Sequence, residues 1–140
     1  MVDKDIIYQK INRIQNCLKR IYDTLQDDPE RLNDYDIQDI VTLNLQRAIQ
    51  LTIDLAAHMV RSESYGMPKS LKENFQLLHQ HHWIDNDLKV KMEHMVGFRN
   101  IAVHDYESIN PEILKSIFKH HLKDIEAFYT TLVEKIDSGA

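Results

Sequence analysis

Hydrophobic residues recur every three or four positions along almost the whole chain, which is the period of amphipathic α-helices. The first such segment runs from about Asp3 to Gln26, and Asp27-Asp28-Pro29 ends it because proline cannot continue a helix. Its apolar stripe, with spacings of 4, 3, 4, 3 and 4, consists of Ile7, Ile11, Ile14, Leu18, Ile21 and Leu25. We therefore predict a long first helix that buries one face.

Four further segments show the same periodicity. The second runs from about Asp36 to Ser64, and the third begins at Ser70, which forms a capping-box pair with Glu73. The fourth covers residues 85–103. The fifth starts at Asn110-Pro111, and its stripe is Leu114, Phe118, His121, Ile125, Phe128 and Leu132. These segments predict an all-α, up-down bundle of about five helices, forming a single helical domain over residues 1–140.

Composition removes several classes of function. The three glycines, Gly66, Gly97 and Gly139, are isolated, so neither a phosphate-binding loop nor a dinucleotide fingerprint can be built. Cys17 is the only cysteine, which excludes an intrachain disulfide and a cysteine zinc site and indicates a cytoplasmic protein. No signal peptide or membrane segment is expected. The net charge of −5 means that any contact with nucleic acid must depend on a small local site.

The fourth segment carries a charged residue on its apolar stripe. Leu88, Met92, Met95, Arg99, Ala102 and Tyr106 follow a spacing of 4, 3, 4, 3 and 4. Arg99 then either lies at the edge of the stripe, pairs with a carboxylate, or reaches a contact between subunits. His104 follows five residues later, about 140° around an ideal helix. The two side chains therefore do not share a face unless the helix ends or a second copy completes the site.

The second segment carries a polar stripe beside its apolar one. Asn44, Arg47, Asp54 and His58 fall on one face together with Leu51. This stripe is either a solvated surface or a polar wall that faces Arg99.

The histidines do not form a metal-binding pattern. His79, His81, His82, His120 and His121 occur in clusters, but neither Glu-x-x-His nor His-Glu-x-x-His is present. We interpret them as surface or helix-end residues and expect neither a metal nor a cofactor. Cys17 falls within the pattern of the first helix and is expected to be packed rather than nucleophilic.

The segment Arg99-Asn100-Ile101-Ala102-Val103-His104-Asp105-Tyr106 resembles the signature of HEPN-domain ribonucleases, in which four to six residues separate Arg from His and a polar residue often follows the Arg. The fuller pattern Arg-x4-His-x-Tyr is similar to the HepT toxin branch of the HepT/MntA family. Two runs of the second segment, residues 43–47 and 53–56, are also similar to that branch.

The resemblance implies a metal-independent endoribonuclease toxin of a type VII toxin–antitoxin system, acting as a homodimer on RNA. Arg99 and His104 would be catalytic. The implied partner is a minimal, MntA-like nucleotidyltransferase antitoxin that attaches AMP to Tyr106.

Four residues are expected to support such a site. Asn100 could contact phosphate or a base, and Asp105 could orient an imidazole or cap the following loop. Arg47 and Asp54 would belong to the polar wall. Tyr106 itself could instead be a core tyrosine whose hydroxyl is hydrogen-bonded.

Two other functions remain open. The chain could be a non-catalytic HEPN bundle that binds nucleotide or serves as an accessory subunit of a nucleotidyltransferase, or it could be a dimerisation bundle. The intact pair of Arg99 and His104 argues against the first alternative, and an arginine on an apolar stripe argues against the second.

Overall fold

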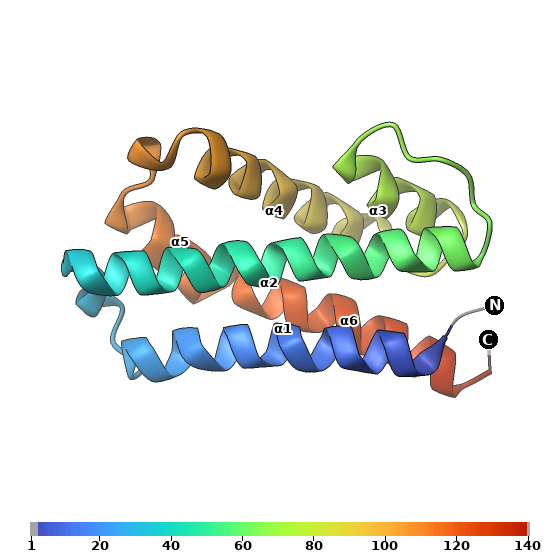
Figure 1. Cartoon of the computed structure of the whole chain (residues 1–140), viewed down its shortest axis with the longest axis horizontal. Coiled ribbons are helices and arrows are strands. Elements are labelled where there is room, and N and C mark those ends of the chain that lie inside the picture. Colours follow the sequence, from blue (N-terminus) through green and yellow to red (C-terminus); the bar gives the residue numbers. More distant parts are fainter. Residues whose placement is uncertain (1–2, 140) are drawn as a thin grey trace.

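The computed structural model describes residues 3–139, and all regular structure within them is helical. Six α-helices and two short 3₁₀ helices follow one another along the chain (Figure 1). Their bounds are α1 Lys4–Leu25, η1 Pro29–Asn33, α2 Tyr35–Ser62, α3 Leu71–Gln80, α4 Asn86–His104, η2 Tyr106–Ser108, α5 Pro111–His120 and α6 Leu122–Asp137. The predicted all-α class is confirmed.

Side-chain caps fix where these helices begin. Asp3, Asp34 and Asp85 each accept hydrogen bonds from backbone N–H groups in the first turn of α1, α2 and α4. Asn110 caps α5 in the same way, directly before its first-turn proline. At the other end of α1, Gln26 adopts a left-handed conformation with φ 50°, which turns the chain toward η1.

The helices pack around one continuous apolar core. The pair α1 and α2 lies side by side and runs in opposite directions, with α3 and α4 along one edge of α2 and α6 behind (Figure 1). All six members of the predicted α1 stripe are buried. Phe75 of α3 meets Phe128 of α6 edge-on, with ring centroids 5.3 Å apart. None of the helices in residues 3–139 is long and apolar enough to span a bilayer.

The last predicted segment is not one helix. It breaks at His121, where φ is −124° and ψ is −14°, and continues as α6. An unbroken helix would have carried the imidazole of His121 into the core with no partner, at a considerable cost in free energy. The break instead leaves His121 exposed, with its Nδ1 3.0 Å from Oδ2 of Asp124. The prediction that His121 belongs to a buried stripe was wrong.

The fourth segment ends within one residue of its predicted end at Val103, so the stripe does not extend to Tyr106. Asp105, with φ −148° and ψ 62°, leaves the helical conformation, so α4 ends at His104 and Tyr106 begins η2. Tyr106 therefore does not continue the buried face of α4.

Candidate functional site

Arg99 lies half-buried on the side of α4 that packs against α2. Its Nε donates to Oε1 of Gln50 at 3.1 Å, and its Nη1 donates to Oδ1 of Asn100 at 3.1 Å. Both acceptors are neutral amides, and no carboxylate among residues 3–139 lies within ion-pair distance of the guanidinium. Arg99 therefore keeps its full positive charge and its other N–H groups for an anion.

Gln50 is held in turn by Asp54, one turn further along α2. Its Nε2 donates to Oδ1 of Asp54 at 2.9 Å. A carboxylate only accepts hydrogen bonds, so it attracts the amide nitrogen and leaves the amide oxygen facing Arg99. Asp54 thus fixes the orientation of Gln50, and Gln50 fixes that of Arg99.

His104 is exposed at the C-terminal end of α4. No hydrogen bond or ion pair joins its ring to any residue from 3 to 139. Since five residues of α-helix separate it from Arg99, the two side chains leave the helix axis about 140° apart. One chain therefore cannot direct both groups at one atom.

Tyr106 ties the end of α4 to the start of α2. Its side chain is 47 % exposed, and its hydroxyl donates a hydrogen bond to Oδ1 of Asp39. That hydrogen bond, together with partial burial and the charge of Asp39, raises the pKa of Tyr106 above its ordinary value. The phenol stays protonated at neutral pH and is accessible, so it is not a core tyrosine.

Asn100, which follows Arg99, and Asp105, which follows His104, each form a hydrogen bond with a nearby residue of the chain. Asp105 accepts a hydrogen bond from the hydroxyl of Ser108, which closes the turn after α4, and Asn100 contacts Arg99 as described above. Between Asn100 and Glu107, Ala102 is the single buried residue. The segment that carries the motif is thus almost entirely presented to solvent.

A polar groove lies between α1 and α2, with a volume of about 590 Å³. It contains the exposed residue Arg47, and Gln50 and Asp54 also line it. Its complete lining is Arg13, Asn16, Cys17, Arg47, Gln50, Leu51 and Asp54. Arg47, Leu51 and Asp54 of the predicted polar stripe therefore line a groove that reaches Arg99 through Gln50. His58 is not part of this lining, and its Nε2 lies 3.3 Å from the hydroxyl of Ser62. Asn44 departs from that stripe, since it is buried and donates to the carbonyl of Ile40.

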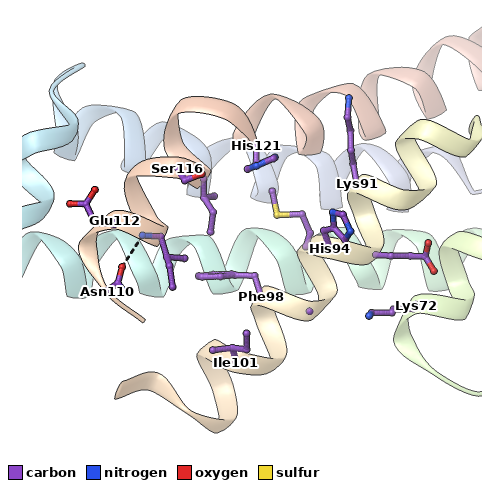
Figure 2. A pocket seen from close by; sticks show the side chains of 14 residues that line it. Lys72, Lys91, His94, Phe98, Ile101, Asn110, Glu112, Ser116 and His121 are labelled. Atoms are coloured by element: carbon purple, nitrogen blue, oxygen red, sulfur yellow. Dashed lines mark hydrogen bonds between the residues drawn. The ribbon is translucent and has the colours of Figure 1, made fainter. Parts of the chain in front are cut away.

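The larger hollow of the molecule lies elsewhere, between α4 and α5, and holds about 700 Å³ (Figure 2). Figure 2 shows Phe98 and Ile101 directed into it from α4, with Lys91 and His94 nearer one end and Asn110 and Glu112 nearer the other. Arg99, His104 and Tyr106 are not part of its lining. The candidate site is therefore defined by the positions and partners of Arg99, His104 and Tyr106, and it lies outside this hollow.

Two of the clustered histidines, His79 and His81, have partners within the fold. The ring of His81 stacks on Tyr65 with centroids 3.6 Å apart, and Nδ1 of His79 lies 3.0 Å from the carbonyl of Ile84. Across residues 3–139, no three His, Cys, Asp or Glu side chains are grouped closely enough to hold a metal ion.

Comparison with known proteins places this arrangement in a family. Residues 9–132 match the family described as "Ribonuclease HepT-like". The chain belongs to the HepT-like ribonuclease family. The predicted family and the predicted class of enzyme, a ribonuclease, are thereby confirmed.

Individual relatives are similar to this HepT-like chain over nearly their full length. The chain is 43 % identical over 124 residues to the mRNA nuclease HepT of Shewanella oneidensis, and the match covers 89 % of this chain and 93 % of the relative. A crystal structure of a toxin–antitoxin with AMP-PNP superposes with a TM-score of 0.87 at 40 % identity, covering 93 % of this chain and 98 % of the other. The tri-AMPylated Shewanella oneidensis HEPN toxin in complex with the MNT antitoxin gives a TM-score of 0.86 at 41 % identity, with the same coverage.

Two contacts of the site lie outside the residues that the sequence singled out. Gln50 was visible in principle, because it continues the polar stripe of α2, one turn after Arg47 and one turn before Asp54. Asp39 gave no such signal, since its partner Tyr106 lies 67 residues away in the chain.

Proposed function

We propose that this chain is a metal-independent endoribonuclease toxin of a type VII toxin–antitoxin pair, acting in the cytoplasm as a homodimer of single HEPN-like domains. The observation that carries the proposal is the divergence of Arg99 and His104 from one helix, with no carboxylate of residues 3–139 at ion-pair distance from Arg99. A two-fold axis near the end of α4 would bring the exposed His104 of each copy toward the other copy's motif. The family and the toxin–antitoxin relatives support this reading.

The reaction needs only groups that two such chains supply. The imidazole of one His104 takes the proton from a ribose 2′-hydroxyl, whose oxygen then bonds to the adjacent phosphorus. Arg99 stabilises the charge that develops on the phosphate oxygens with its planar fork of N–H groups. The bond from phosphorus to the 5′-oxygen breaks as the second His104 protonates that oxygen. The products are a 2′,3′-cyclic phosphate and a 5′-hydroxyl end.

Incubation of the purified chain with total RNA in EDTA tests this function. We expect new fragments that end in 2′,3′-cyclic phosphate, because no step needs a divalent cation. Their absence from an unmodified chain, verified by intact mass, would contradict the proposal and favour a non-catalytic bundle. An intact mass higher by one or more AMP groups would require repeating the assay on unmodified protein.

We further propose that a minimal nucleotidyltransferase antitoxin silences the chain by adding AMP to Tyr106. The phenolic oxygen would attack the α-phosphorus of a nucleoside triphosphate and release pyrophosphate, and Asp39 would accept the phenolic proton. A base is needed there because a tyrosine phenol is protonated at neutral pH, and the carboxylate of Asp39 already accepts its hydrogen bond. The AMP phosphate would then compete with RNA near Arg99. The tri-AMPylated relative with its antitoxin supports this proposal.

Substitution of Gln50 tests the role of Arg99. In Gln50→Leu the guanidinium loses the acceptor of its Nε, so we expect kcat/KM for RNA to fall by about 10- to 100-fold, as for loss of a hydrogen bond to a charged group. Gln46→Leu, a change of the same kind one turn earlier on α2, is the matched control. Equal activity of the Gln50→Leu variant and the parent would show that Arg99 needs no positioning.

A further inference from the structure

The polar groove between α1 and α2 carries a local excess of positive charge. Arg13 and Arg47 are both exposed, and within residues 3–139 neither has a carboxylate at ion-pair distance. Asp54 is the one acidic residue of the lining, and its carboxylate already accepts a hydrogen bond from the amide of Gln50. In a chain with a net charge of −5, this groove is the kind of small local site to which a polyanion would be confined.

The two arginines line the groove from opposite helices, Arg13 from α1 and Arg47 from α2. Cys17 belongs to the same lining, and the positive charges of Arg47 and Arg13 both lower the pKa of its thiol, against the larger opposing effect of burial. Both positive charges therefore act on this groove. Guanidinium groups bind phosphate oxygens in pairs of parallel hydrogen bonds. The amides of Asn16 and Gln50 in the same lining offer donors and acceptors that suit a ribose or a base.

The groove is continuous with the proposed reaction site. Gln50 belongs to its lining and also accepts the hydrogen bond from Nε of Arg99. Arg47 lies three residues before Gln50 on α2, which is a rise of about 4.5 Å along the helix. A strand whose phosphate is held by Arg99 would reach this lining at Gln50, and Arg47 of α2 and Arg13 of α1 belong to the same lining. The helices α1 and α2 run side by side in Figure 1.

We propose that the groove between α1 and α2 binds the single-stranded RNA next to the phosphodiester that is cut, with Arg13 and Arg47 holding backbone phosphates. This inference rests on the proposed ribonuclease function and assigns its substrate track. Arg13 and Arg47 are positioning residues, because they hold the flanking strand and not the reacting atoms.

Direct binding tests the groove without relying on cleavage. All variants are made in a His104→Ala chain, and the probe is a fluorescent single-stranded oligoribonucleotide, titrated at several salt concentrations. We expect the double change Arg13→Gln and Arg47→Gln to weaken binding by about tenfold or more at low salt. We also expect the slope of log K against log salt to decrease by about 0.7 for each lost phosphate contact. Lys123→Gln removes one positive charge from α6, half of the change in the double variant, and should bind as the parent does.

Kinetics with His104 restored give a second readout. On long RNA, the double variant should raise KM by about tenfold, with a smaller loss in kcat, because the flanking strand is held less well. Both side chains are exposed, so circular dichroism should show an intact helical fold.

Three results would overturn the proposal. The first is unchanged RNA binding by the double variant, and the second is equal weakening by Lys123→Gln, which would indicate only the overall charge. The third is a lower association state of the double variant in sedimentation, which would make this face a contact between copies of the chain. If the parent chain binds RNA through the two arginines yet cuts none, the groove stands and the proposed nuclease function fails.

Discussion

Replacement of His104 with alanine is expected to abolish RNA cleavage while fold and association remain intact. General acid–base catalysis by a positioned side chain contributes about 10²–10⁴-fold, and the proposed mechanism uses His104 for both proton transfers. The imidazole is exposed at the end of α4 and bonds to no residue between 3 and 139, so its removal leaves no unsatisfied group. The appearance of 2′,3′-cyclic phosphate ends, with growth of cells that express the variant, measures the effect.

The matched control is His94→Ala, which removes an exposed histidine from the same helix. We expect it to cleave RNA as the parent does. Cleavage by the His104→Ala chain at the parent's rate would contradict the mechanism. Arg99→Ala should also inactivate the chain. That change also removes the hydrogen bonds from Arg99 to Gln50 and Asn100, so the His104→Ala variant tests catalysis with less disturbance of the structure.

Replacement of Tyr106 with phenylalanine is expected to separate cleavage from silencing. The ring remains but the nucleophilic oxygen is lost, so incubation with the antitoxin and a nucleoside triphosphate should add no AMP, and cleavage should continue. Intact mass and RNA cleavage after incubation report the two effects.

Asp39→Asn keeps Tyr106 but weakens the proton acceptor, and we expect slower AMP addition in that variant.

Tyr8→Phe is the appropriate control for that experiment. Tyr8 is an exposed tyrosine whose hydroxyl also donates to a carboxylate, Asp137, at 2.7 Å. Its replacement should leave AMP addition and silencing unchanged. Silencing of the Tyr106→Phe chain by the antitoxin, with no change in mass, would show that tight binding and not modification is the switch.

Most of the helical architecture followed from periodicity, because a buried stripe and its caps are local properties of the sequence. The α1 stripe from Ile7 to Leu25 is the clearest case. The break at His121 could not be found in this way. The residues from Leu114 to Leu132 keep a regular spacing, and only the burial penalty of an imidazole, which depends on the assembled core, divides them.

The candidate site was predictable only as far as its residues share one helix. Arg99 emerged as an anomaly on its stripe and His104 from the resemblance to HEPN-domain ribonucleases, and their divergence followed from helix geometry alone. The hydrogen bonds between helices could not be predicted from the sequence. The bond from Arg99 to Gln50 joins residues 49 positions apart, and the bond from Tyr106 to Asp39 joins residues 67 positions apart. Such pairs depend on how α4 packs against α2, and the hydrophobic pattern within one helix does not specify that packing.

The motif segment from Asn100 to Glu107 contributes a single buried side chain to the core. Substitution of the exposed His104, which has no hydrogen-bond partner among residues 3–139, should therefore change the free energy of unfolding by no more than about 0.5 kcal/mol. One mutation at His104 could therefore remove the proposed ribonuclease activity while the gene still encodes a well-folded bundle. Selection against the proposed toxin would then leave inert helical bundles that later lineages could use for new roles.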